Sequence, residues 1–138
     1  MSGHKHLFDC VTASPSGQQL AGRLAAGGAL SCAGVDDAGW AHLGAALREQ
    51  TGRTVVFVVN ALKLQETLQQ DLETWLRLMN IDAPAKYFPD WEVLPHEHKL
   101  PHADTISERL ETLQALAGDG PAPVITTTVA ALMQCTLP

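Results

Sequence analysis

The chain has 138 residues, of which 46% are hydrophobic and 17% are charged, and this composition excludes an intrinsically disordered protein. Its formal net charge of −6 argues against a protein that grips the phosphate backbone of a nucleic acid by itself. No apolar run approaches the roughly 18 residues that a membrane-spanning helix needs, and the N-terminus lacks the layout of a signal peptide.

The first half of the chain predicts an N-terminal arm over residues 1–14, followed by helices that alternate with strands. Ser14 and Pro15 are typical of a helix start, and the glycines at 27 and 28 end that helix. The short apolar run 28–34, GALSCAG, predicts a buried strand, and the next helix ends at Gly52. The continuous β-branched run 53–60 predicts a strand that is covered on both faces.

The second half predicts a long amphipathic helix over 61–80, which begins after Asn60 as its cap. Its expected core stripe is Leu64, Leu68, Leu72, Trp75, Leu76 and Met79, and its expected outer face is Gln65, Glu66, Gln69, Glu73 and Arg77. A weak strand over 85–88 follows, and then a helix over 104–118 that should bury Ile106, Leu110, Leu113 and Ala117. Thr105 and Glu108 could form a capping box there. The chain closes with a strand over 123–128 and a short helix.

This alternation predicts an α/β domain over 15–138, a three-layer sandwich. Its mostly parallel sheet of about four strands should carry helices on both faces. Because the sequence stops directly after an apolar run, we expect a fragment that is truncated before a further domain.

The turn after the first predicted strand is where such a fold would bind a phosphate, because the following helix offers free N–H groups. Gly34 and Gly39 have the spacing of the G-x-x-x-x-G-K-[ST] phosphate loop. Trp40 replaces its lysine, Ala41 replaces its serine or threonine, and two aspartates add negative charge, Asp36 and Asp37. The turn therefore has the outline of a P-loop NTPase without its chemistry. Ordinary turn and packing glycines explain Gly34 and Gly39 equally well, and we expect no cofactor.

The remaining candidates for chemistry are weak. His96, His98 and His102 could supply three ligands to zinc, but their loop is rich in proline, lacks cysteine and matches no usual zinc spacing, so surface histidines are the favoured interpretation. The three cysteines, Cys10, Cys32 and Cys135, are odd in number and widely spaced, which indicates a reducing cytoplasm without a disulfide framework. We expect Cys32 and Cys135 to be small core residues and Trp91 to be a packing anchor between the acids Asp90 and Glu92.

The stretch FPDWEVLPHEHKLPHADTISERLETLQAL, followed by PVITTTVAALMQ, resembles the first UvrB-like module of the bacterial transcription-repair coupling factor. The matching residues are Phe88, Pro89, Asp90, Trp91, Glu92, Leu94 and Pro95, then Ile106, Ser107, Arg109, Leu110 and Leu113, then Leu132, Met133 and Gln134. The resemblance covers residues 28–138, and its D-W-E-x-L-P segment is the most specific part. His96 and His98 are not part of that pattern, so no family role transfers to them.

The resemblance implies a fold like domain 1a of UvrB, in which nucleotide binding has been lost, in agreement with Trp40 at the lysine position. It implies a cytoplasmic parent that is an ATP-dependent DNA translocase, displaces stalled RNA polymerase and recruits UvrA. The UvrA-binding domain would follow near Pro138, so we expect this chain to be a non-catalytic scaffold with little or no DNA binding. In place of the DNA-gripping hairpin of UvrB, the chain has only a short loop over 89–103.

Two other classes of function stay open from the sequence. One is a UvrB-type helicase or nucleotide hydrolase fragment, against which the missing G-K-[ST] speaks. The other is a stand-alone protein-interaction module without a role in repair.

Overall fold

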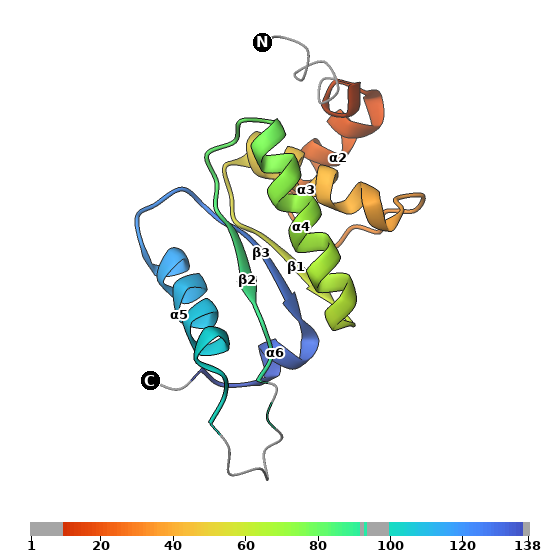
Figure 1. The fold of residues 1–138 in the computed structure, drawn as a ribbon. Coiled ribbons are helices and arrows are strands. Elements are labelled where there is room, and N and C mark those ends of the chain that lie inside the picture. The colour runs from red at the N-terminus through yellow and green to blue at the C-terminus, as the bar shows by residue number, and fades with distance from the viewer. Residues whose placement is uncertain (1–9, 92, 94–99, 137–138) are drawn as a thin grey trace.

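The computed structural model describes residues 10–91, 93 and 100–136, and it shows a small parallel sheet with helices packed against it (Figure 1). The elements in chain order are α2 (Pro15–Ala26), α3 (Asp37–Thr51), β1 (Val55–Val59), α4 (Leu62–Leu78), β2 (Ala85–Phe88), α5 (Ala103–Ala117), β3 (Val124–Thr128) and α6 (Val129–Met133). Among these helices none is both long enough and apolar enough to cross a membrane. The order of these elements confirms the predicted helices and the last three predicted strands.

The sheet has three parallel strands in the order β1-β3-β2. Thr126 of β3 donates its hydroxyl to Gln69 Oε1 of α4, so it faces α4. Phe88 of β2 pairs with Thr127, the next residue along, and its ring lies against Arg109 of α5. Because neighbouring side chains in a strand point to opposite faces, α4 and α5 cover opposite faces of the sheet (Figure 1). The expected three layers are present.

The expected fourth strand is absent from the described residues, because residues 28–34 form an irregular, largely exposed segment. Gly28 and Gly34 have φ values of 110° and 84°, a conformation incompatible with a regular strand. The prediction was wrong because the run contains one leucine beside alanine, serine, cysteine and glycine, and so no β-branched or aromatic residue to pack on a sheet. Cys32 is exposed rather than buried, as are Cys10 and Cys135, so the expectation of core cysteines was also wrong.

The core lies between the sheet and the pair of helices α3 and α4. It consists of Ala41, Ala45, Leu68, Leu72, Leu76 and Val124, with the rest of the predicted α4 stripe at least partly buried around it. Gly44 lets α3 approach β1 closely, because a Cβ atom there would lie 2.3 Å from the ring of Phe57. Small residues on the buried side of α3 thus set the distance between this helix and the sheet.

Two glutamines of α4 lie inside the protein, although periodicity places them on the outer face. Gln65 is fully buried and donates from Nε2 to the carbonyl oxygens of Phe88 and Thr126, at 3.2 and 3.0 Å. Gln69 accepts the Thr126 hydroxyl at 2.7 Å. These hydrogen bonds offset part of the cost of burying the two amides, although Gln65 Oε1 has no hydrogen-bond partner among the described residues. They tie α4 to the end of β2 and to the middle of β3. Asn60 does not cap this helix, whose N-cap is Ala61 without a side-chain bond.

Helix α5 buries a different side from the one that its hydrophobic pattern predicts. Thr105, Arg109 and Thr112 are buried. Of the residues expected in the core, Ile106 is partly buried, whereas Leu110, Leu113 and Ala117 are exposed. Thr112 donates its hydroxyl to the Tyr87 carbonyl oxygen of β2, so a polar residue makes the contact with the sheet. The predicted capping box does not form, since the N-cap is His102 without a side-chain bond.

Strand β1 is an edge strand, not one that is covered on both faces. Val55, Phe57 and Val59 are partly buried against α3 and α4, but Val56 and Val58 are 48% and 49% exposed. The continuous apolar run correctly predicted a strand but not its position in the sheet. A strand buried on both faces and a strand with one open face differ only in what packs on them from elsewhere in the chain.

We expect the stability of the fold to fall in mild acid through His42, whose ring lies 4.7 Å from that of Trp75. Burial lowers the pKa of His42 below its ordinary value of 6.5, so the unfolded chain takes up the proton more readily. The stabilisation is therefore complete above pH 6.5 and is lost as the pH falls toward the folded-state pKa. Urea unfolding in neutral and in mildly acidic buffer measures this loss, and His42→Phe should show a smaller one. An equal loss in both proteins would assign the effect to other groups.

Candidate functional site

The turn that resembles a phosphate loop ends at the N-terminus of α3. Asp36 is the N-cap residue of α3, and its Oδ1 accepts the Gly39 N–H at 2.8 Å. Gly34 has a φ of 84°, which favours glycine, and a Cβ atom on Gly39 would lie 2.9 Å from Asp36 Oδ1. The conformation of Gly34 and the close packing of Gly39 therefore each explain why glycine occupies the position, without a bound phosphate. The carboxylate of Asp36 holds the position in which a phosphate would contact the helix N-terminus.

The two residues at the lysine and serine or threonine positions face the protein rather than an anion. Trp40 is half-buried and packs against the core, and Ala41 is completely buried. Neither offers a cation or a hydroxyl to a nucleotide. Asp37, in the first turn of α3, adds a second negative charge to the helix end.

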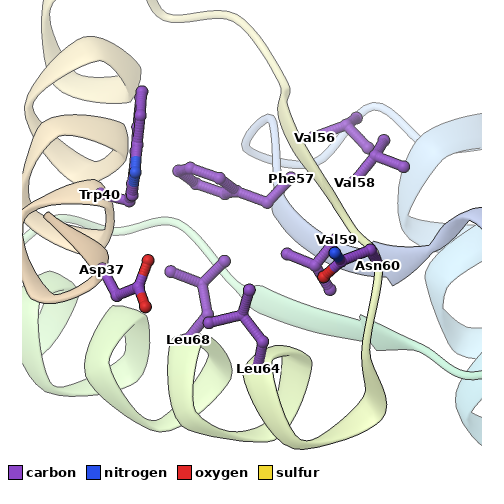
Figure 2. Close-up of a pocket in the computed structure, with 9 residues that line it drawn as sticks. All are labelled: Asp37, Trp40, Val56, Phe57, Val58, Val59, Asn60, Leu64 and Leu68. Carbon is purple, nitrogen blue, oxygen red and sulfur yellow. The ribbon is translucent and has the colours of Figure 1, made fainter. Parts of the chain in front are cut away.

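A pocket of about 540 Å³ lies between this helix start, β1 and α4 (Figure 2). Its lining residues are Asp37, Trp40, Val56, Phe57, Val58, Val59, Asn60, Leu64 and Leu68. Figure 2 shows Trp40 and Phe57 on one side of β1, while Val56 and Val58 point away to the other. Among the described residues of the lining, Asp37 alone is charged, so the pocket suits apolar groups and repels anions.

The second candidate site is the buried side chain of Arg109, around which the motif residues gather. Its Nη1 donates to the Pro89 carbonyl oxygen at 2.6 Å, and its Nη2 to that of Gln134 at 2.8 Å. The Nε and Nη2 atoms also donate to Thr136 Oγ1, at 3.2 and 3.0 Å. The fully buried guanidinium therefore joins α5 to the segment after β2 and to the segment after α6.

Two aromatic rings enclose the same guanidinium. Its Cζ lies 4.1 Å from the ring centroid of Phe88 and 4.4 Å from that of Trp91, both within cation–π range. Burial lowers the pKa of Arg109, while the charge of Asp90 opposes this shift. Carbonyl dipoles and aromatic faces thus replace the water that the cation has lost.

Trp91 also binds the segment after α6, through two hydrogen bonds. Its main-chain N–H donates to Gln134 Oε1 at 2.6 Å, and its indole N–H donates to the Cys135 carbonyl oxygen at 3.0 Å. Phe88, Pro89, Trp91, Arg109 and Gln134 thus form one contiguous group, named here the Arg109 cluster. Its contacts connect α5, the segment after β2 and the segment after α6.

The other motif residues lie outside this cluster or outside the described residues. Ser107 is exposed and Met133 is 81% exposed, while Asp90 is half-buried. Glu92, Leu94 and Pro95 fall outside the described residues, as do His96 and His98. His102 is exposed at the N-cap of α5. Within the described part of the chain, no three His, Cys, Asp or Glu residues come together as a metal site would require.

Sequence reasoning named the members of the Arg109 cluster through the resemblance, but it did not assign Arg109 its central role. Arginine in an amphipathic helix is ordinarily a surface residue, and hydropathy carries no signal to the contrary. Comparisons of the chain with protein families, with characterised proteins and with solved structures give no match.

Proposed function

We propose that the chain is the non-catalytic N-terminal module of a transcription-repair coupling factor, with a fold like domain 1a of UvrB. The observation that carries the proposal is the Arg109 cluster. Residues quoted for the resemblance are far apart in the sequence, yet four of them contact the buried guanidinium of a fifth, Arg109. Because these motif residues contact one another in the folded protein, there is a physical reason for them to occur together in one sequence.

The geometry of the α3 N-terminus supports a role without nucleotide chemistry. Asp36 caps the helix, Asp37 adds charge, and the fully buried Ala41 stands where a magnesium-binding hydroxyl would be needed. In this proposal the module acts in transcription-coupled nucleotide excision repair in the cytoplasm as a scaffold. It packs on the remaining domains of an ATP-driven DNA translocase, and UvrA and RNA polymerase are contacted only through that full-length parent.

A chimera tests this proposal. Residues 28–138 would replace the corresponding stretch of a transcription-repair coupling factor, and the chimera would be assayed for displacement of stalled RNA polymerase and for capture of purified UvrA. We expect both activities at about the level of the unmodified factor, whereas the isolated chain should capture neither UvrA nor DNA. A chimera that folds but has lost both activities would contradict the assignment, and capture of UvrA by the isolated chain would move the recruitment surface into it.

We expect no appreciable binding of Mg-ATP by the chain. Phosphate would meet the carboxylates of Asp36 and Asp37 instead of a lysine, and each unfavourable contact opposes binding. Calorimetric titration of the purified chain with Mg-ATP measures this directly, and a P-loop hydrolase titrated alongside provides the positive control. A micromolar dissociation constant would instead support the UvrB-type hydrolase.

A further inference from the structure

The outer edge of β1 is open in the part of the chain that the structure describes, where only β3 pairs with it. The Val55 N–H donates to the Pro123 carbonyl oxygen, so the main-chain groups of Val55, Phe57 and Val59 point toward β3. Those of Val56 and Val58 point outward. The edge therefore presents hydrogen-bonding groups in the arrangement that another strand requires.

Nothing within β1 protects this edge. The strand reads VVFVV, without the charges, proline or bulge by which proteins ordinarily prevent edge-to-edge pairing. Its outward-facing residues also carry exposed side chains, since Val56 and Val58 are 48% and 49% exposed. A second strand added at this edge would therefore form main-chain hydrogen bonds and bury apolar side chains at the same time.

The two ends of the edge carry opposite charge, which selects the orientation of the added strand. In the pocket along residues 56–60, Asp37 is the one charged residue among the described residues of the lining. A second hollow of about 550 Å³ lies between α2, α3 and the start of β1, and Arg53 is the one charged residue that the described part of the chain contributes to its lining. A second copy running antiparallel brings the Arg53 hollow of each chain against the Asp37 pocket of the other.

We propose that two copies of this chain pair through β1 across a two-fold axis and so join their sheets into one. Because the main-chain groups of Val56 and Val58 point outward, Val56 of one copy lies opposite Val58 of the other, with Phe57 on the axis. About four main-chain hydrogen bonds form between these residues. The four valine side chains gather on one face, and an Arg53–Asp37 pair closes each end.

The test is sedimentation of the purified chain across the micromolar range, with matched variants. Val58→Lys places a charge on the edge at a site that is already half exposed, and Leu110→Lys places the same charge on the equally exposed Leu110 of α5. The native chain and Leu110→Lys should dimerise alike, and Val58→Lys should raise the dimer dissociation constant by about ten-fold or more. Circular dichroism shows whether each variant is folded.

A charge exchange tests the orientation. Arg53→Glu and Asp37→Lys should each weaken the dimer, and the two changes combined in one chain should restore it. A native chain that is monomeric throughout the range, or a dimer that Val58→Lys leaves intact, would overturn the proposal. So would growth of open-ended polymers instead of a closed dimer, or a failure of the double variant to restore pairing.

Discussion

Replacement of Arg109 by alanine is expected to lower the free energy of unfolding by about 3–5 kcal/mol, the range found when a partner is removed from a buried charged network. The change leaves the buried carbonyl oxygen of Pro89 and the partly buried one of Gln134 without their donors. Each unsatisfied group of this kind costs about 1–3 kcal/mol. The faces of Phe88 and Trp91 also lose their cation and gain a void between them.

The lysine variant separates charge from shape. Arg109→Lys keeps the positive charge but loses the planar set of donors that reaches both carbonyl oxygens and Thr136 at once. We therefore expect Arg109→Lys to be destabilised nearly as much as the alanine variant. A lysine variant close to native stability would show that charge alone holds the cluster.

Urea unfolding followed by circular dichroism measures both changes. The matched control is Arg77→Ala, the same substitution at an exposed position near the end of α4, which should alter stability by about 0.5 kcal/mol or less. Tryptophan fluorescence provides a local signal, because Trp91 is held by the Arg109 cluster. An Arg109→Ala protein within the error of the Arg77→Ala control would refute the structural importance of the cluster.

The elements of the fold were largely predictable from the sequence, because their signals are local. Ser14 accepts the Gly17 N–H as the expected cap, Gly52 ends α3 in a left-handed conformation, and the VITTT run forms a strand. Such features depend on capping and on periodicity within a few residues. The expected strand over 28–34 failed because glycine-bounded small residues fit a loop as well as a strand.

Which side each helix buries was less predictable, because burial of a polar side chain depends on partners that are distant in sequence. Gln65 lies inside because its amide donates to the carbonyl oxygens of Phe88, at the end of β2, and Thr126, in the middle of β3. Arg109 lies inside for the same reason, and Leu110 beside it is left exposed. Hydropathy scores residue types one at a time and cannot register acceptors that come from another part of the chain. The sequence therefore identified the residues of the candidate site, but it did not predict that Arg109 would lie at the centre of their contacts.

Replacement of Gly44 by alanine is expected to destabilise the protein by about 1–3 kcal/mol, the usual cost of overpacking. In an open helix position the same change would stabilise by about 1 kcal/mol, because alanine has the higher helix propensity. At Gly44 the added methyl group would lie 2.3 and 2.4 Å from two ring atoms of Phe57. Steric overlap of this size exceeds the gain in propensity, so either α3 or the ring must move.

A double-mutant cycle with Phe57→Leu identifies the clash as the cause. The smaller leucine removes the ring atoms in question, so Gly44→Ala should cost distinctly less in that background than in the native chain. Gly22→Ala serves as the matched control in α2, because a Cβ atom there meets nothing within 4 Å. Urea unfolding of the four proteins of the cycle gives the coupling energy. If Gly44→Ala were as stable as the native chain, or if the cycle were additive, then close packing of α3 on β1 would not be what Gly44 provides.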